Sequence, residues 1–460
     1  MWTEQAIASD VTQTPSGTPT ADLRLLSQEG PWIAFASDEG LWVADAQNRV
    51  VKRILSVSGP AYRSISFSGS SDRGALAFAE PPPQGDYTAS GDPIFNTPAP
   101  GAESSLFVVY LPSTTLHEVS PLLAPAQAIA IATQFPFEQG THGWYRHPDA
   151  WYLTEQIRAA YGRPGSLAWS PDGSQLAFTA SIYGTTSDLY LFDSGTGRLS
   201  RLSTGPTQAA SPIWSPDGRY IVHKAIEDFN TGERSGNDIV SGLWSAAADG
   251  SSSILLAPGD IRPVAWLSAT DLLAYKWVWP CDSFNLAVVN VATGQSRPLW
   301  QGPFEAVAAD PLSGAILLGN PYEGNEICPS SAPLGLFLIR ADGTPPTRLA
   351  DYDFTQLWYY VPPIEWSEPL RLFIVQGRRL YTTEGQLSTP STRKREPWDS
   401  LATSDAFCNK SWSSDHSMLA LSDDSNVYLA RTPDFSPQVL SQGHSGLCAY
   451  GMQWVLPSGG

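Results

Sequence analysis

Apolar and polar residues alternate in short runs along most of this chain. In residues 166–203, Leu167 and Trp169 fall on one face of a predicted strand, and Leu176 and Phe178 repeat that alternation in the next strand. An SPDG turn separates the two runs, with proline presetting φ and glycine accepting a positive φ. The runs DLYLFD and RLSRLS follow. This segment therefore predicts four short antiparallel strands joined by hairpins.

The same pattern recurs along the chain, and a tryptophan marks each clear copy. These residues are Trp169, Trp214, Trp266, Trp366, Trp412 and Trp454. Two degenerate copies place Phe67 and Ala308 in the tryptophan position. Repeats of roughly 40–45 residues with four strands each are typical of β-propeller blades. We expect each tryptophan to fill the space between neighbouring blades.

Counting the copies predicts an all-β fold, a single eight-bladed β-propeller. The last copy contains only a first strand, GMQWVLPS, and the first copy, beginning at Pro31, lacks that strand. We therefore expect the C-terminal strand to pair with the N-terminal blade and close the ring, which removes exposed sheet edges. Seven blades is the alternative, if blade 2 or blade 6 is not a full sheet. The predicted domain covers residues 23–460, and residues 1–22 read as a disordered polar tether.

The repeated pattern WSPDGxxLAFxS…DLYLFDxxTG resembles the TolB-type propeller repeat of bacterial periplasmic and secreted proteins. Residues 166–205 and 211–257 match it closely, and the other copies match weakly. The resemblance implies the fold, whereas it assigns no site, because the motif residues build the sheets and one fold supports many functions.

Charge and hydropathy exclude two classes of partner. The chain carries 27 basic and 45 acidic residues, a net charge of −18, and only five lysines. Nucleic-acid binding is therefore not expected, because it depends on clustered cations. No apolar run reaches the ~18 residues that span a bilayer. Membrane association is expected only through an N-terminal anchor that is absent from this chain.

The four cysteines occupy matched positions in the repeat. Cys281 and Cys328 follow second strands in blades 5 and 6, whereas Cys408 and Cys448 precede first strands in blade 8 and the closing blade. Four cysteines allow three pairings, and the repeat register favours Cys281–Cys328 and Cys408–Cys448. Disulfides indicate an oxidising, extracytoplasmic location, as a secreted protein or a cell-surface or periplasmic lipoprotein. The alternative is four independent buried thiols.

Insertions gather at one end of the predicted blades, at residues 81–103, 120–165, 225–241 and 319–333. Elaborated loops on one face of a repeat scaffold often carry function. Aromatic and charged residues at or near this inserted face form the candidate binding site: His142, Trp144, Tyr145, Arg146, His147, Trp277, Trp279, Tyr322, Glu323, Trp358, Tyr359 and Tyr360. The alternative is that these aromatics pack the insertions onto the blades.

Catalytic motifs are not found: the sequence has no GxSxG, no HExxH and no phosphate loop. The catalytic residues are unknown, and no metal site or cofactor is indicated; a calcium ion would suit acidic loops, but no calcium-loop spacing occurs. We therefore expect a noncatalytic binding or scaffold propeller that recognises a protein or glycan partner through the inserted face. The alternative is a carbohydrate-active enzyme, a glycoside hydrolase or polysaccharide lyase, with carboxylates drawn from Glu227, Asp228, Glu323 and Glu326.

Overall fold

The structure is a computed structural model of the whole chain. The residues that it describes are 26–56, 65–71, 73–79, 86–87, 93–94, 105–112, 116–124, 126–127, 138–140, 143–145, 160, 165–229, 238–278, 283–322, 332–352, 364–375, 379–388 and 407–457. The chain divides into two compact units, residues Met1–Pro212 with Gly443–Gly460, and residues Ile213–Gln442. The predicted tether, residues 1–22, lies outside the described residues.

The first unit holds the first three blades, each a four-stranded antiparallel sheet. Blade 1 consists of β1 (Trp32–Ser37), β2 (Gly40–Asp45), β3 (Val51–Ser56) and β36 (Met452–Val455). Blade 2 consists of β4 (Phe67–Gly69), β5 (Ala75–Ala79), β8 (Ser105–Tyr110) and β9 (Leu116–Pro121). Blade 3 consists of β12 (Leu167–Trp169), β13 (Gln175–Ala180), β14 (Asp188–Asp193) and β15 (Leu199–Arg201). Two small hairpins lie in the predicted insertions: β6 (Asp86–Tyr87) with β7 (Pro93–Ile94), and β10 (Glu138–Gly140) with β11 (Gly143–Tyr145). The short helix α4 (Leu447–Tyr450) precedes β36.

The second unit holds the remaining blades, and the chain enters it within β16. Blade 4 consists of β16 (Gln208–Trp214), β17 (Tyr220–Asp228), β18 (Ile239–Ala247) and β19 (Ser253–Pro258). Blade 5 consists of β20 (Ile261–Trp266), β21 (Asp271–Val278), β22 (Ser283–Asn290) and β23 (Ser296–Gly302). Blade 6 consists of β24 (Ala306–Ala309), β25 (Ala315–Asn320), β26 (Gly335–Arg340) and β27 (Thr347–Ala350). Blade 7 consists of β28 (Ile364–Ser367), β29 (Leu372–Val375), β30 (Arg379–Tyr381) and β31 (Leu387–Ser388). Blade 8 consists of β32 (Asn409–Trp412), β33 (Met418–Ser422), β34 (Asn426–Arg431) and β35 (Gln438–Gln442).

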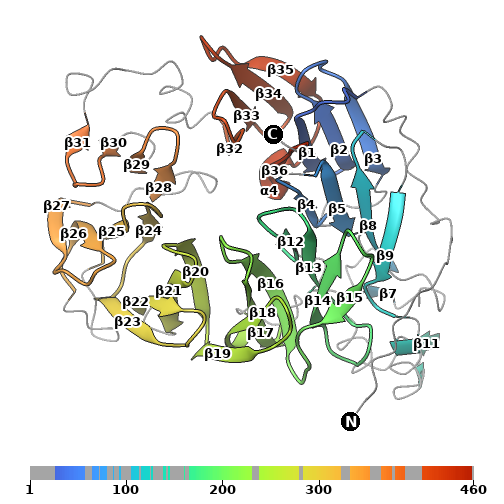
Figure 1. Cartoon of the computed structure of the whole chain (residues 1–460), viewed down its shortest axis with the longest axis horizontal. Helices are drawn as coiled ribbons and strands as arrows, with labels where there is room; N and C mark the ends of the chain where they lie inside the picture. The colour runs from blue at the N-terminus through green and yellow to red at the C-terminus, as the bar shows by residue number, and fades with distance from the viewer. Residues whose placement is uncertain are drawn as a thin grey trace. The chain divides into compact units, whose positions relative to one another are not determined.

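The fold is therefore an eight-bladed β-propeller, as the repeat predicts. Blades 2 and 6, the two on which the seven-bladed alternative depended, are both full four-stranded sheets. The predicted pairing of the chain ends is also present: β36 runs antiparallel to β1, with Trp32 opposite Val455 and Phe35 opposite Met452. Figure 1 shows this red C-terminal strand in the blue N-terminal sheet.

Trp169 of the repeat fills the space between blades 2 and 3, as expected. Trp169 is 8% exposed and packs in one apolar cluster with residues of both blade 2 and blade 3. Its indole Nε1 donates a hydrogen bond to the carbonyl oxygen of Ser68 in β4 over 3.0 Å. The SPDG hairpin has the predicted geometry as well, because Gly173 adopts a φ of +65°. These contacts leave the repeat tryptophan no ligand-facing role in blade 3.

One predicted register is wrong by a single residue. The strand pairing of blade 6 joins Ala309 to Ile316, with the spacing of Trp169 and Leu176 in blade 3. Ala309, rather than Ala308, thus occupies the tryptophan position, and it packs in the cluster that includes residues of blade 5. An alanine side chain does not mark the tryptophan position of the repeat, so the sequence alone did not distinguish Ala308 from Ala309.

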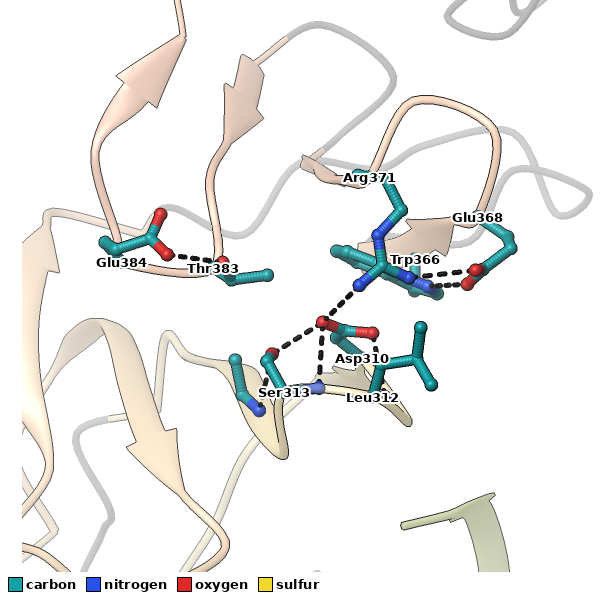
Figure 2. Close-up of polar contacts among 9 residues, drawn as sticks. Asp310, Leu312, Ser313, Trp366, Glu368, Arg371, Thr383 and Glu384 are labelled. Carbon is teal, nitrogen blue, oxygen red and sulfur yellow. Dashed lines mark hydrogen bonds and ion pairs between the residues drawn. The ribbon is translucent and has the colours of Figure 1, made fainter. Parts of the chain in front are cut away.

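An ion-pair network joins the hairpin after β24 to the hairpin after β28 (Figure 2). Asp310 is fully buried, and its carboxylate accepts hydrogen bonds from the Leu312 and Ser313 backbones and from Arg371 Nη2 at 3.1 Å. Arg371 also pairs with Glu368 at 2.8 Å, and its guanidinium lies 5.0 Å from the centre of the Trp366 ring. This network fastens blade 7 to blade 6.

Replacing Asp310 with alanine is expected to lower the free energy of unfolding by about 3 kcal/mol, because two backbone donors and Arg371 lose a buried partner. Glu368→Ala is the matched control: this carboxylate is half-exposed, so its loss should change stability by less than about 1 kcal/mol. Urea denaturation of both variants measures the difference. Equal effects would show that the buried carboxylate does not fasten the two blades.

Candidate functional site

The inserted end of each blade is where the second strand leads into the third and where the fourth strand leads into the next blade. Among the predicted site residues, Tyr322 follows β25 at this end of blade 6, and its side chain is 38% exposed. Trp277 lies in β21, and Trp144 and Tyr145 lie in β11. The other predicted residues, His142, Arg146, His147, Trp279, Glu323, Trp358, Tyr359 and Tyr360, lie outside the described residues.

A cluster of charged side chains occupies the inserted ends of blades 4 and 5. Asp260, in the loop between β19 and β20, accepts hydrogen bonds from Arg262 Nη2 at 2.9 Å and from Arg262 Nε at 3.2 Å. The Nζ atom of Lys224 in β17 lies 3.9 Å from the other oxygen of this carboxylate. The Asp260 hydrogen bonds and charge raise the pKa of Arg262 above its usual value, although burial acts to lower it. Arg262 is therefore a permanent cation, held in a fixed orientation and 39% exposed.

Aromatic rings connect this cluster to blade 6. Tyr275 is directly opposite Arg262 in the pairing of β20 with β21. Its ring meets Phe304 edge-on, with ring centres 5.3 Å apart. Phe304 is buried and immediately precedes Glu305 in the chain.

Glu305 and Tyr352 form a second polar group at the inserted end of blade 6. Glu305 directly precedes β24, and its backbone N–H donates to the carbonyl of Gly319 at 2.8 Å. Burial raises the pKa of the Glu305 carboxyl more than the neighbouring Tyr352 hydroxyl lowers it. Burial, and then the adjacent Glu305, raise the pKa of Tyr352. The charge of the Tyr322 phenol adds a smaller effect, which also raises the pKa of Tyr352.

We name Arg262, Tyr275, Glu305, Tyr322 and Tyr352 the blade 5–6 cluster. It offers a fixed cation, a carboxyl group with a raised pKa, phenol hydroxyls and one exposed ring. Such a combination suits recognition of a ligand that has both polar groups and an apolar face.

Sequence reasoning found only Tyr322 of this cluster. Arg262 is the second residue of the first strand of blade 5, Glu305 directly precedes the first strand of blade 6, and Tyr352 lies two residues after the last strand of blade 6. A search for polar residues immediately before or within each first strand would have found Arg262 and Glu305. The predicted carboxylates Glu227 and Asp228 lie at the end of β17, whereas Glu323 and Glu326 fall outside the described part of the chain.

Metal ligands and membrane spans were also sought in the described residues. No group of three or more His, Cys, Asp or Glu side chains there could hold a metal ion. In the same part of the chain, no helix combines the length and apolar character needed to cross a membrane.

Two of the four cysteines are described, and both Cys408 and Cys448 are disulfide-bonded. The prediction of oxidised cysteines is thus confirmed for these two residues. The predicted bridge between Cys281 and Cys328 lies outside the described residues.

Comparison with known proteins identifies little beyond the fold. No family model matches the chain. An uncharacterised peptidase of Bacillus subtilis, YuxL, is 39% identical over 54 residues, which is 12% of this chain and 8% of that protein. The chain therefore corresponds to a small fraction of the curated relative.

Solved structures show similarly distant likenesses. TolB from Acinetobacter baumannii has a TM-score of 0.32 at 15% identity, covering 68% of this chain and 62% of that one. An oligogalacturonate lyase from Vibrio parahaemolyticus has a TM-score of 0.39 at 8% identity, covering 77% and 88%. A puromycin-hydrolysing peptidase of Mycobacterium tuberculosis has a TM-score of 0.42 at 13% identity, covering 84% and 54%. None of these values supports a transfer of function to this chain.

Proposed function

We propose that this TolB-type β-propeller is a noncatalytic, extracytoplasmic binding protein that recognises a protein or glycan partner through the inserted ends of its blades. The observation that carries the proposal is the blade 5–6 cluster, in which the Arg262 guanidinium is held by Asp260 and the Tyr275 ring meets Phe304 at the inserted ends of two adjacent blades. Binding sites commonly combine aromatic contact area with a few oriented polar groups. The disulfide-bonded state of Cys408 and Cys448 supports an oxidising compartment.

A second candidate, a carbohydrate-active enzyme, is favoured by one observation. Burial raises the pKa of Glu305, and a raised carboxyl pKa is the direction that a general acid requires. Glycoside hydrolysis by the usual mechanism needs a second carboxyl group about 5–10 Å away. Glu227 and Asp228 are the described carboxylates that the sequence offered for this role, and they lie on β17 of blade 4. The binding function needs no such partner, so we favour it.

The binding function is tested by titration of the intact purified chain. The probes are a glycan array and an array of purified extracytoplasmic proteins, and the strongest hit is then measured against variants. Arg262→Ala is expected to weaken binding by about tenfold or more, because it removes a charged hydrogen-bond donor held at the cluster.

Arg219→Ala is the matched control for this experiment. Arg219 also pairs with an aspartate two residues earlier, Asp217, but it lies in the hairpin between β16 and β17, at the opposite end of the blade strands. Its loss is expected to leave affinity unchanged. Turnover of any substrate in a hydrolase and lyase panel, abolished by Glu305→Gln, would replace the binding function by the enzymatic one.

A further inference from the structure

The chain contains four Asp-Gly pairs, and each lies in a β-hairpin that the structure describes. The pairs are Asp172-Gly173 between β12 and β13, Asp217-Gly218 between β16 and β17, Asp249-Gly250 between β18 and β19, and Asp342-Gly343 between β26 and β27. The glycine nitrogen of such a pair can attack the carboxyl carbon of the aspartate side chain, because glycine has no Cβ to obstruct the approach. The contacts of each hairpin decide how readily this attack occurs.

The reaction needs no co-reactant except water. The glycine nitrogen bonds to the aspartate carboxyl carbon, and the amide hydrogen leaves with the carboxyl O–H as one water molecule, which gives a succinimide ring. Water then opens the ring at either carbonyl carbon, so the product is aspartate or isoaspartate, whose main chain runs through the side-chain carbon. The two reacting atoms must come close together, so contacts that hold the carboxylate or the glycine slow the reaction.

Both reacting groups of Asp172-Gly173 are held in place. Ser170 Oγ donates to Asp172 Oδ1 at 2.6 Å, and Ser174 Oγ lies 2.8 Å from each carboxylate oxygen. The Ser174 N–H adds a hydrogen bond to Oδ1 at 3.0 Å. Gly173 is buried, and a Cβ on it would lie 3.3 Å from Cγ of Arg73. We therefore expect this pair to react slowly.

Asp249-Gly250 is also followed by a serine, but it has fewer contacts. The Ser251 N–H donates to Asp249 Oδ1 at 2.8 Å, and hydrogen bonds from Ser251 lower the pKa of this carboxyl. The position that corresponds to Ser170 holds Ala247, which has no hydroxyl to donate. Both Asp249 and Gly250 are exposed. The carboxylate thus lacks the second serine hydroxyl, and the glycine lacks the burial, that protect the pair in blade 3.

The hydrogen bond made by the glycine N–H does not distinguish the two hairpins. Gly173 donates to the Ser170 carbonyl at 2.8 Å, and Gly250 donates to the Ala247 carbonyl at 2.9 Å. The difference therefore comes from the aspartate side chain and from the cover over the glycine.

The remaining two pairs each have one of these protections. Asp217 accepts hydrogen bonds from Ser215 Oγ at 2.7 Å and from Arg219 Nε, so its carboxylate is held as that of Asp172 is. Asp342-Gly343 is exposed, but a Cβ on Gly343 would lie 3.2 Å from Arg297 Nη1, so this guanidinium covers one side of the glycine. We expect both pairs to react at intermediate rates.

We propose that Asp249-Gly250 is a site of isoaspartate formation in the folded protein and that the fold protects Asp172-Gly173 from the same reaction. The site lies in the hairpin between the third and fourth strands of blade 4, at the opposite end from the insertions. The inference therefore does not rest on the proposed function. Conversion of Asp249 lengthens the main chain of the hairpin by one carbon atom and moves the carboxylate away from the Ser251 N–H.

The test is incubation of the intact chain at neutral pH and physiological temperature, followed by peptide mapping with mass spectrometry and enzymatic methylation of isoaspartate. We expect isoaspartate to accumulate at residue 249 about tenfold faster than at residue 172, because additional hydrogen bonds hold the Asp172 carboxylate away from the attacking nitrogen. Equal rates at the two residues, or faster reaction at residue 172, would overturn the proposal.

The sequence itself supplies a matched control, since Asp-Gly-Ser occurs at both 172–174 and 249–251. In the chain unfolded by denaturant, the two sites should react at equal rates, because the contacts of the fold are absent. A tenfold difference that persists after unfolding would show that the fold does not set it.

Two variants complete the test. Ser170→Ala should raise the rate at residue 172 by several-fold and leave the rate at residue 249 unchanged. Asp249→Glu should remove the modification at residue 249, because the longer side chain would have to close a larger ring. An unfolding midpoint close to that of the unmodified chain would show that Ser170→Ala is folded, and the comparison of folded with unfolded chain decides the proposal if it is not.

Discussion

Deleting residues 452–460 is expected to abolish the cooperative unfolding of this protein and to make it aggregate. The deletion removes β36, which pairs with β1 along Trp32–Phe35, all buried residues. It also removes Leu456, whose N–H donates to the Ser70 carbonyl at 3.0 Å and whose carbonyl accepts the Gly74 N–H at 2.6 Å. Loss of these bonds leaves an apolar strand as an open sheet edge, which is a site for intermolecular pairing.

A point variant tests the same contact in a chain that still folds. Val455 is fully buried in blade 1, so Val455→Ala should lower the free energy of unfolding by about 2 kcal/mol through lost apolar burial and a residual cavity. Val439→Ala is its control, because Val439 lies in strand β35 but is 49% exposed, and its loss should change stability by less than about 0.5 kcal/mol. Chemical denaturation measures both. A soluble deletion variant with an unchanged transition would show that β36 is dispensable.

Acidification is expected to destabilise the fold through His223. This side chain lies in β17, is 4% exposed, and its Nδ1 has no hydrogen-bond partner among the described residues. Burial lowers the pKa of His223 from 6.5 to about 4. Between these two values the unfolded chain binds a proton that the folded chain excludes, so stability falls as pH decreases.

The size of the effect follows from that difference. Stability from this residue is complete above pH 6.5 and declines until about pH 4, where the folded state also takes up the proton. The total loss is about 3 kcal/mol, at ~1.4 kcal/mol for each unit of pKa difference. No further loss from His223 is expected below pH 4.

Denaturant titrations from pH 8 to pH 4 measure this dependence. His223→Leu, which keeps a similar volume without a titratable group, should lose about 3 kcal/mol less than the unmodified chain over that range. His416→Leu is the control, because His416 lies in the hairpin between β32 and β33 and is not fully buried. Identical pH profiles for His223→Leu and the unmodified chain would exclude this residue as the acid-sensitive group.

The propeller itself could be predicted because its signals are local. Alternation with a period of two indicates which face of a strand is buried, and an SPDG turn indicates a hairpin. About 40 consecutive residues are therefore enough to predict each blade. The partial copies of the repeat at Trp32 and Trp454 also predicted that the last strand pairs with the first blade, as β36 does with β1. At Ala308 and Ala309 the same reasoning missed by one residue, because alanine carries no clear preference for either position.

The candidate site depended on contacts between segments far apart in the chain. Of its residues, only Tyr322 was predicted, since it begins a visible insertion. Arg262 is a single polar residue within the first strand of blade 5, Glu305 directly precedes the first strand of blade 6, and Tyr352 reads as an ordinary core aromatic. No periodic pattern distinguishes such residues, because their role comes from the neighbours that other loops supply.

By itself, then, the sequence determined the number of blades, their hairpins and the strand that completes blade 1, because hydrophobic alternation and turn chemistry act between near neighbours. Only the tertiary structure decided that Glu305 lies beside Tyr352 and that burial raises the pKa of both groups. Burial and pairing of a polar group are properties of the packed blades, where residues brought from separate repeats replace the water that would otherwise solvate it.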